Sequence, residues 1–287
     1  RDWSSDVCSS DLRNELSGTL SGLTRVRHFI QDDGHIYVRP DQIESEIDAL
    51  LGEVATVYGW FALPVEFVFS TKPAKALGDP KLWEKAEAMI ESALKRSGAK
   101  WRLNAGDGAF YAPKIDIIVR DALGREWQTA TIQVDLAMLP ERFDLEYVDE
   151  SGERVRPIAI HRAIYGSLER FIGILVEHYA GAFPFWLSPE QVVIIPITDR
   201  HTDAARAGAA ALRAAGIRVS IDDSSNRMQN KIRRAQEQKV PLMLVLGDKE
   251  VEIGGASPRW RDGTQEQAQS WESLATALAT LAASRSA

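Results

Sequence analysis

The stretch from Arg25 to Tyr37, RVRHFIQDDGHIY, constrains the fold more than any other part of the chain. Side chains two residues apart lie on the same face of a β-strand. A strand over 24–37 therefore has one polar face and one more apolar face. The polar face carries Arg25, Arg27, Phe29, Gln31, Asp33 and His35. Such a face can bind an anion that carries a planar base, because arginine pairs with phosphate oxygens and phenylalanine stacks on a purine. A solvated sheet face with a chance mixture of charges explains the same pattern equally well.

The composition indicates a globular protein of two domains. The chain has 287 residues, a net charge of −7 and a single cysteine, Cys8. One cysteine excludes an intramolecular disulfide and is typical of a reducing cytoplasm. No apolar run approaches the roughly 18 residues of a membrane helix, and no secretory signal is visible, so we expect a cytoplasmic protein without a membrane partner. The negative charge argues against a protein that coats nucleic acid, but a local basic surface suffices for phosphate contacts.

The chain divides by pattern into a leader and two domains. Residues 1–12, RDWSSDVCSSDL, lack periodicity and are expected to be a foreign or disordered leader that includes Cys8. Residues 13–187 mix strands with a few helices, and residues 188–287 alternate strands and helices, which predicts an α/β domain with a largely parallel sheet. In the first domain we predict strands over 13–16, 24–37, 65–69, 114–120 and 129–136, and helices over 40–58, 80–97 and 162–180. In the second we predict strands over 192–197, 217–221 and 242–246, and helices over 203–215, 227–238 and from about 265.

The segment RNELSGTLSGLTRVRHFIQDDGHIY, from Arg13 to Tyr37, resembles the second signature motif of class II aminoacyl-tRNA synthetases in its threonyl form. Two strands, over 13–16 and 24–37, would form a hairpin across a glycine-containing loop. The resemblance implies an α+β core with an antiparallel sheet that binds ATP. It implies these roles: Arg13 on the α-phosphate, Glu15 on the adenine amino group, Arg25 on the phosphates, Phe29 stacked on adenine, Gln31 on the reacting carboxylate or phosphate, and Asp33 on the threonine hydroxyl.

The segment HRAIYGSLERFIGILVEHYAG, from His161, is similar to the third signature motif of this class. Its apolar residues recur with a helical period, and we predict that Gly166 and Gly173 lie inside the helix where it packs closely on a sheet. The resemblance assigns Arg170 to the γ-phosphate and adenine. A solvated charge is the ordinary alternative for a helical arginine.

The threonyl enzymes hold a catalytic zinc ion with two histidines and one cysteine, and His35 and His161 match the histidine positions. On spacing alone, satisfied structural histidines are the commoner reading. Three protein ligands leave zinc an open position, which the amino and hydroxyl groups of threonine fill. The cysteine is expected upstream of Arg13 with the first class II motif, outside this chain, because Cys8 does not match its context.

Two further segments resemble the block between these motifs. NAGDGAFYAPKIDIIVRD implies that Tyr111 faces the threonine amino group and that Lys114 contacts the α-phosphate or a carboxylate oxygen. An exposed lysine at a strand end is the alternative for Lys114. In WQTATIQVDL, Gln128 and Gln133 point to opposite faces unless a bulge intervenes. We favour Gln128 as the ATP contact by its position in the family.

The stretch from Pro189 resembles the anticodon-binding domain shared by threonyl, prolyl, histidyl and glycyl enzymes, most clearly at GDKEVE, Gly247–Glu252. By position, Arg233, Glu250 and Arg259 would contact anticodon bases or the nearby backbone. Each is equally explained as a surface charge. Ser224, Ser225 and Asn226 replace the Arg-Asn-Glu that is usual in the family.

Together these resemblances predict a threonine–tRNA ligase, here as a truncated chain without an editing domain, that uses zinc and Mg²⁺ with ATP. Its partners would be threonine, threonine tRNA and, in the full-length family, a second copy in a homodimer. One alternative is a non-catalytic tRNA-binding remnant of a synthetase, against which the intact charges of Arg13, Glu15, Lys114 and Arg170 argue. Another is a sister ligase for proline or serine, against which the two histidines argue.

Overall fold

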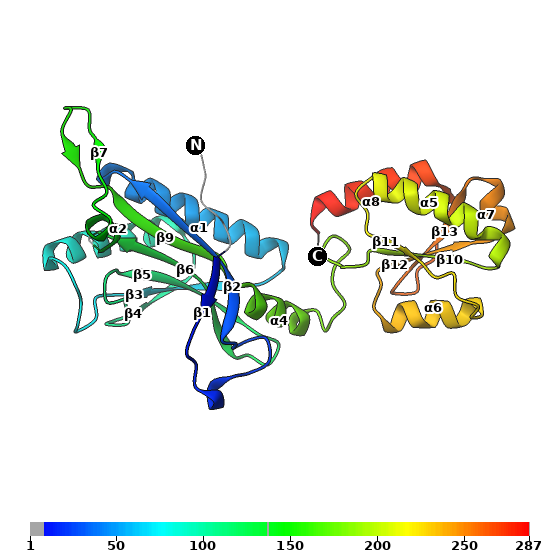
Figure 1. Cartoon of the computed structure of the whole chain (residues 1–287), viewed down its shortest axis with the longest axis horizontal. Coiled ribbons are helices and arrows are strands. Elements are labelled where there is room, and N and C mark those ends of the chain that lie inside the picture. The colour runs from blue at the N-terminus through cyan, green and yellow to red at the C-terminus, as the bar shows by residue number, and fades with distance from the viewer. Residues whose placement is uncertain (1–8, 137, 287) are drawn as a thin grey trace. The chain divides into compact units, whose positions relative to one another are not determined.

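The computed structural model describes residues 9–136 and 138–286. The chain divides into two compact units, with residues up to His178 in unit 1 and residues from Tyr179 in unit 2 (Figure 1). Within the described residues, no helix is both long enough and apolar enough to cross a membrane.

Unit 1 is built on a seven-stranded sheet with the order β1-β2-β9-β6-β5-β3-β4. All neighbouring strands are antiparallel except β3 and β4, which are parallel. The strands are β1 (Ser9–Leu12), β2 (His28–Val38), β3 (Val65–Ser70), β4 (Trp101–Asn104), β5 (Lys114–Arg120), β6 (Glu126–Asp135) and β9 (Ile158–Ser167). This arrangement confirms the predicted α+β core with an antiparallel sheet.

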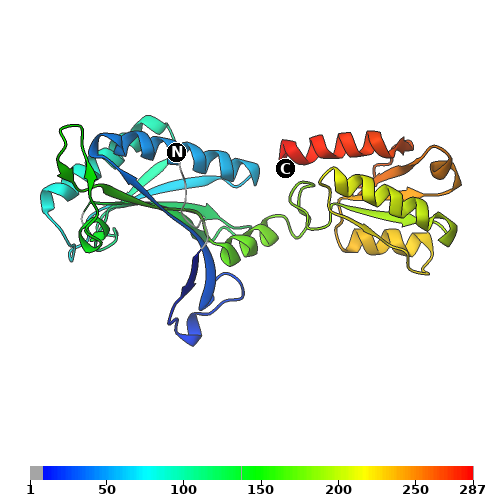
Figure 2. The ribbon, with the colours of Figure 1, turned by 45° about the horizontal axis from the view of Figure 1, so that its top comes forward.

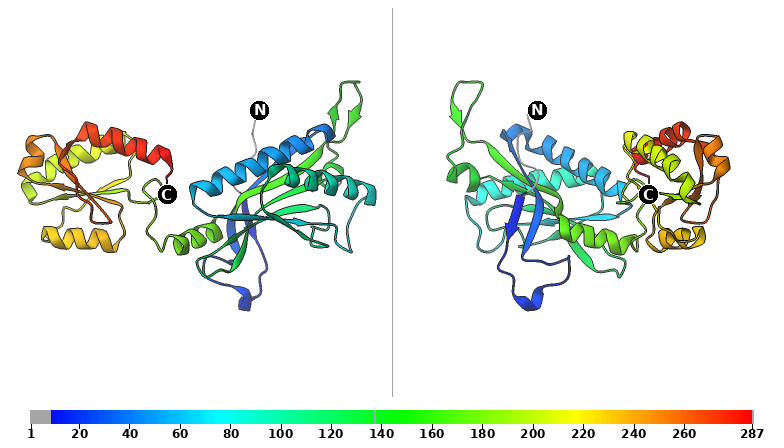
Figure 3. Two further views of the ribbon diagram at one scale, coloured as in Figure 1. Left: turned by 180° about the vertical axis from the view of Figure 1, so that it is seen from behind. Right: turned by 45° about the vertical axis from the view of Figure 1, so that its right-hand side comes forward.

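Helices α1 (Ile43–Trp60) and α2 (Pro80–Ser97) lie together on one side of this sheet, and the loop between β1 and β2 projects from the other (Figures 2 and 3). Helix α2 has the predicted bounds because its ends are encoded locally. Asp79 caps it through the Lys81 N–H, Pro80 occupies its first turn, and Gly98 follows it at φ 66°. The short elements of unit 1 are η1 (Ser17–Thr19), η2 (Pro40–Gln42), α3 (Met138–Arg142), β7 (Tyr147–Val148) and β8 (Arg154–Val155).

Unit 2 contains a five-stranded sheet with the order β11-β10-β12-β13-β14, parallel over its first three strands and antiparallel over the rest. Helices α5 and α8 cover one face and α6 covers the other (Figure 1). The elements are β10 (Val192–Pro196), η3 (Asp199–His201), α5 (Thr202–Ala214), β11 (Val219–Ile221), α6 (Met228–Glu237), β12 (Leu242–Leu246), α7 (Asp248–Glu252), β13 (Gly255–Trp260), β14 (Gln269–Ser270) and α8 (Trp271–Ser284). The mixed sheet confirms the α/β prediction for this half.

The boundary between the units differs from the prediction near residue 188. The segment after His178 belongs to unit 2 because its carbonyl groups accept hydrogen bonds from that unit. Arg218 donates to the carbonyl of Trp186 at 2.7 Å, and Arg261 donates to that of Phe183 at 3.1 Å.

The beginning of the described chain also differs from the prediction. Ser9–Leu12, which the sequence assigned to a leader outside the fold, forms β1 and pairs with His28–Gln31 of β2. The predicted strand over 13–16 is irregular backbone that continues this pairing through a bond from the Arg13 N–H to the Arg27 carbonyl. The hairpin is therefore present, with its first strand four residues earlier.

The predicted helix over 162–180 is wrong in its first part. Residues up to Ser167 extend β9, and helix α4 runs only from Leu168 to His178. Gly166, which we placed inside the helix, is a strand residue with φ 62°. A Cβ atom at this position would lie 2.0 Å from the carbonyl oxygen of Thr129. Gly166 is required because the backbones of β9 and β6 come too close for a side chain.

We expect Gly166→Ala to destabilise unit 1 more than Gly98→Ala, which has a similar φ of 66° but no atom within 4 Å of its added Cβ. Both variants carry the left-handed penalty of about 1–2 kcal/mol. Only Gly166→Ala adds a steric cost of about 1–3 kcal/mol. Urea unfolding of the two variants measures the difference, and equal losses of unfolding free energy would show that the two backbones separate freely.

Candidate active site on one face of the sheet

The register of four strands places predicted site residues side by side in one row. Lys114 of β5 pairs with Gln133 of β6, Gln133 pairs with His161 of β9, and His161 pairs with His35 of β2. Cross-strand partners point to the same face, about 4.5–5.5 Å apart at Cβ. The four polar groups therefore form a continuous line across the sheet, although they are far apart in the sequence.

A second row lies two residues further along each strand, on the same face. It consists of Asp116, Thr131, Ala163 and Asp33. Buried apolar residues such as Ile132, Val134 and Ile160 alternate with these positions and form the opposite, core-facing surface.

A β-bulge lies beside these rows in β6. Ile117 pairs with Ala130, but the next residue, Ile118, pairs with Gln128, so Thr129 is an extra residue. The extra residue reverses the alternation, and Gln128 and Gln133 line the same cavity. Simple alternation had predicted that only one of them could.

The cavity at the β2 end of this face has a volume of about 280 Å³. It is lined by Arg13, Glu15, Thr24, Arg25, Val26, Phe29, Gln31, Gln128, Thr129, Ala130, Thr131, Gln133, Ala163, Gly166, Ser167 and Arg170. This set includes Gln31 and the six residues assigned to ATP from the family resemblance, namely Arg13, Glu15, Arg25, Phe29, Gln128 and Arg170. Four other predicted site residues lie outside the lining, in the two rows that adjoin it: Asp33, His35, Lys114 and His161. Tyr111 also lies outside the lining and donates a hydrogen bond of 2.5 Å to Gln133, which is part of it.

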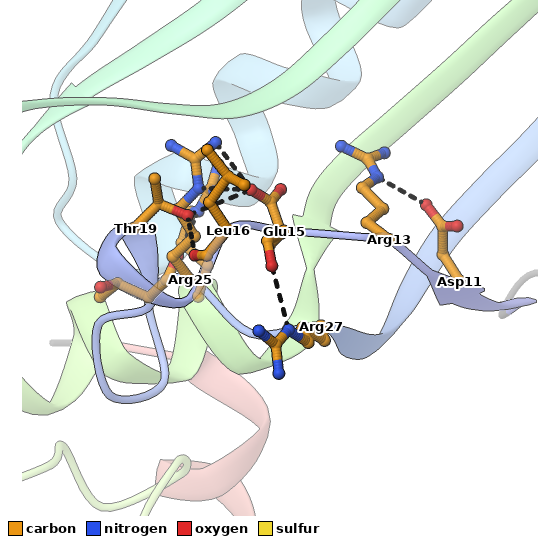
Figure 4. Close-up of polar contacts among 9 residues, drawn as sticks. Asp11, Arg13, Glu15, Leu16, Thr19, Arg25 and Arg27 are labelled. Carbon is orange, nitrogen blue, oxygen red and sulfur yellow. Dashed lines mark hydrogen bonds and ion pairs between the residues drawn. The ribbon is translucent and has the colours of Figure 1, made fainter.

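The β1–β2 hairpin supplies one wall of the cavity, and the polar contacts among its residues are drawn in Figure 4. The Arg25 guanidinium binds the Glu15 carboxylate at 3.1 Å, and Arg27 donates to the backbone carbonyl of Glu15. The Arg13 guanidinium carbon lies 5.0 Å from the centre of the Phe29 ring, and its Nε donates to Asp11 at 3.0 Å. These contacts hold two guanidinium groups and a carboxylate at the mouth of the cavity, over an aromatic ring.

Arg170 supplies the facing wall from helix α4. Its Nε donates to the carbonyl of Thr24 at 2.8 Å and its Nη1 donates to the carbonyl of Gln128 at 3.2 Å. Burial lowers the pKa of the Arg170 guanidinium, and the nearby charges of Arg25 and Arg13 lower it further. Three guanidinium groups thus repel one another around the cavity, and a bound anion would relieve that repulsion.

The two predicted zinc ligands are neighbours at the β2 end of the first row, away from Lys114. The ring centres of His35 and His161 lie 4.6 Å apart. The His161 Nε2 lies 3.2 Å from a carboxylate oxygen of Asp135, which also accepts the N–H groups of Met138 and Leu139. A carboxylate on one ring nitrogen is the usual support of a metal-binding histidine, because it leaves the other nitrogen for the metal.

Burial lowers the pKa of His35, against the opposing effect of the Asp33 charge, and favours the neutral imidazole that binds metals. The two histidines and the supporting Asp135 therefore suit a zinc ion. No group of three or more metal-binding side chains is assembled within residues 9–136 and 138–286. Cys8 lies outside the described residues.

The predicted anticodon contacts divide into two kinds in unit 2. Glu250 of α7 accepts the Ser257 hydroxyl at 2.7 Å and the Gly247 N–H at 2.9 Å, so it is fixed beside β13. Arg259 lies two residues after Ser257 on the same strand face, and its Nε is buried without a hydrogen-bond partner among the described residues. Arg233 instead pairs with Glu237 on the exposed side of α6. Of these three residues, Arg259 alone has a buried side-chain nitrogen without a hydrogen-bond partner within residues 9–136 and 138–286.

Comparison with known proteins accounts for both units. The family model of the class II tRNA synthetase core domain (G, H, P, S and T) matches residues 8–179, and that of the anticodon-binding domain matches residues 191–281. The threonine–tRNA ligase of Anaeromyxobacter dehalogenans (strain 2CP-C) is 53% identical over 267 residues. The chain belongs to the threonyl-tRNA synthetase family.

Solved structures agree with this membership of the synthetase family. The RNA-binding domain of threonyl-tRNA synthetase from Cryptosporidium parvum Iowa II has 40% identity and a TM-score of 0.90, covering 95% of this chain and 69% of that one. A prolyl-tRNA synthetase from Cryptosporidium parvum, with 22% identity and a TM-score of 0.65 over 97% of this chain and 52% of that one, shares the fold. The chain spans 41% of the length of the Anaeromyxobacter relative, which covers 93% of this chain.

Several residues of the site in this synthetase chain were not predicted from the sequence. Asp116 and Thr131 of the second row, and Asp135 behind His161, were not singled out. Asp116 could have been found, because it lies two residues from Lys114 on one strand and must share its face. Asp135 could not, because its role depends on the turn into α3.

We expect inorganic pyrophosphate to stabilise unit 1 by binding between the three guanidinium groups of the cavity. At about 100 times its dissociation constant, a ligand adds about 2.7 kcal/mol to the free energy of unfolding. Arg170→Gln should remove most of this gain. Arg154→Gln, which changes an exposed arginine of β8, should retain it. Thermal unfolding with and without pyrophosphate measures both, and equal shifts in the two variants would contradict the assignment.

Proposed function

We propose that this chain carries the ATP- and threonine-binding sheet and the anticodon-binding domain of a threonine–tRNA ligase. The reaction is the ATP-dependent activation of threonine, followed by transfer to the 3′ end of threonine tRNA. One observation carries the proposal: an arginine-walled cavity adjoins a row of polar groups that ends at two facing histidines. The cavity suits a nucleoside triphosphate, and the row suits a small amino acid with its own polar side chain.

In the first step, a carboxylate oxygen of threonine attacks the α-phosphorus of ATP, and pyrophosphate leaves as threonyl-adenylate forms. Arg13 and Arg25 would hold the phosphates from the hairpin, and Arg170 would hold the γ-phosphate from α4. Phe29, Glu15 and Gln128 would hold the adenosine. Gln31 and Lys114 would orient the reacting oxygens. Catalysis by these residues is positioning and charge stabilisation, with Mg²⁺ on the phosphates and no protein nucleophile.

Threonine would be selected at the end of the row that carries His161 and His35. Asp33 would accept the threonine hydroxyl, and Tyr111 would face the amino group. His35 and His161 would hold zinc, which when bound supplies an open coordination position for the amino and hydroxyl groups. A site that pairs with a substrate hydroxyl rejects an analogue without it, because its own polar groups are then left unpaired.

In the second step, the 3′ hydroxyl of the terminal adenosine of the tRNA attacks the activated carbonyl, and AMP leaves. Unit 2 would recognise the anticodon of that tRNA through Arg233, Glu250 and Arg259. The match of residues 191–281 to the anticodon-binding domain supports this role. A cytoplasmic location and a homodimer also stay predictions from the family resemblance.

The first test is threonine-dependent exchange between ATP and pyrophosphate, with and without added zinc. We expect exchange with threonine and, with valine, a rate lower by about 10⁴-fold, because valine lacks the hydroxyl; serine is a second control. His35→Ala should abolish exchange, whereas His28→Ala, on the exposed part of the same strand, should retain it. No exchange by the wild type, with threonine tRNA still bound, would favour the non-catalytic tRNA-binding alternative.

The second test addresses unit 2 through tRNA binding at one fixed salt concentration. We expect Arg259→Ala to weaken binding of threonine tRNA by about 1–3 kcal/mol, the value of a base contact, and to reduce discrimination against an altered anticodon. Arg206→Ala, on the exposed face of α5, should change neither. Fluorescence anisotropy measures both tRNAs. Unchanged binding by Arg259→Ala would remove this residue from the interface.

A further inference from the structure

Asp116 is a buried carboxylate at the centre of the polar face, and its side chain is the meeting point of three strands. It lies on β5 with 4% of its surface exposed. Its Oδ2 lies 2.8 Å from the Lys114 Nζ and accepts the Ser70 hydroxyl at 2.9 Å. Its Oδ1 accepts the Gln128 side-chain amide at 2.5 Å. Ser70 belongs to β3 and Gln128 to β6, so one carboxylate links three neighbouring strands.

Two of these three partners have places in the proposed reaction. Lys114 begins the row that leads to the histidines, and Gln128 lines the cavity. Both have flexible side chains that lose several rotamers when they are fixed in one position. Gln128 also directly precedes the bulge residue Thr129, where the regular ladder between β5 and β6 is interrupted. The Asp116 carboxylate thus supplies a fixed contact at a place where the backbone pairing is irregular.

The hydrogen bonds of Asp116 also determine which donors and acceptors its partners can present to a ligand. One N–H of the Gln128 amide donates to Asp116, which fixes the amide so that its oxygen can accept from a hydroxyl or amino donor of a bound nucleotide. Lys114 has one close carboxylate partner and a second, Asp107, at 4.0 Å on the exposed side. An ammonium group has three donors, so Lys114 keeps donors for a substrate oxygen while Asp116 fixes its position.

We propose that Asp116 is a positioning residue for the adenylate-forming step, acting through Lys114 and Gln128 without touching the substrates. The proposal rests on the proposed function. Asp116→Asn keeps the shape of the side chain and one acceptor oxygen but removes the charge that holds Lys114. Lys114 then moves from its place in the row, and the reacting oxygens lose their alignment.

A double-mutant cycle in the full chain tests the coupling. We expect Asp116→Asn to lower the kcat of threonine-dependent exchange by about 100-fold, the cost of a small misplacement of a reacting group, with a much smaller change in the KM for ATP. In a Lys114→Met background, the same substitution should cost clearly less than in the wild type, because one of the two groups that Asp116 positions is already absent. Asp107→Asn, the matched change at the other carboxylate near Lys114, should leave exchange unchanged.

Several outcomes would overturn the proposal. An equal loss from Asp116→Asn in both backgrounds would show that it does not act through Lys114. A loss that follows only the folded fraction, measured by urea unfolding, would reduce Asp116 to a structural role. If Asp116→Asn does not fold, a cycle between Lys114→Met and Gln128→Ala replaces it, and losses that multiply independently would overturn the link. Absence of exchange in the wild type would instead contradict the proposed function itself.

Discussion

The site depends first on one buried carboxylate, that of Asp32, at the point where a bulge interrupts the pairing between β2 and β9. Gln31 pairs with Ser167 and Asp33 with Ala163, so the single residue Asp32 stands opposite three residues, Ile164–Gly166. The Asp32 carboxylate accepts the N–H groups of all three at distances from 2.7 to 3.1 Å. An unpaired buried N–H costs about 1–3 kcal/mol, so the bulge is stable only with this side chain in place.

Burial raises the pKa of Asp32, whereas the three N–H groups and Arg162 act in the opposite direction. This balance matters because the register on either side of the bulge places His161 beside His35 and Ser167 beside Gln31. A slip of one residue would move every one of these side chains to the other face of the sheet. The backbone pairing therefore decides which side chains lie on this face of the sheet.

The sequence predicted the content of the site better than its geometry. Residues on a single strand, from Phe29 to His35, could be grouped by alternation, and α2 could be bounded by its own cap, Pro80 and Gly98. What alternation could not predict were the places where it is broken. The helix predicted from 162 was wrong because Ile164 fits a helical stripe as well as a strand, and only the contacts of Gly166 with β6 decide between them. Likewise, Gln128 joins Gln133 on one face only because of the extra residue Thr129.

The local charge at the cavity also differs from the charge of the whole chain. A net charge of −7 is compatible with an anion site because Arg13, Arg25 and Arg170 are brought together from the hairpin and α4. Within the described part of the chain, the carboxylates that pair with these arginines are Glu15 and Asp11. Arg170 reaches the site because α4 starts directly after the bulge that Asp32 satisfies. Fixing the end of β9 thus also fixes the position of a cation.

The two bulges meet, and this contact explains why the cavity lies where it does. Gly166 of the β9 bulge lies directly against the carbonyl of Thr129, the extra residue of the β6 bulge. The hydroxyl of Tyr58, at the end of α1, lies 2.7 Å from the Thr129 hydroxyl and 2.8 Å from the Ile164 carbonyl, so it bonds to both bulges from the core side. Bulges bend strands and redirect side chains. The two adjoining bulges turn Gln128 and Ser167 toward the same cavity. The buried Tyr58 side chain holds both bulges in place.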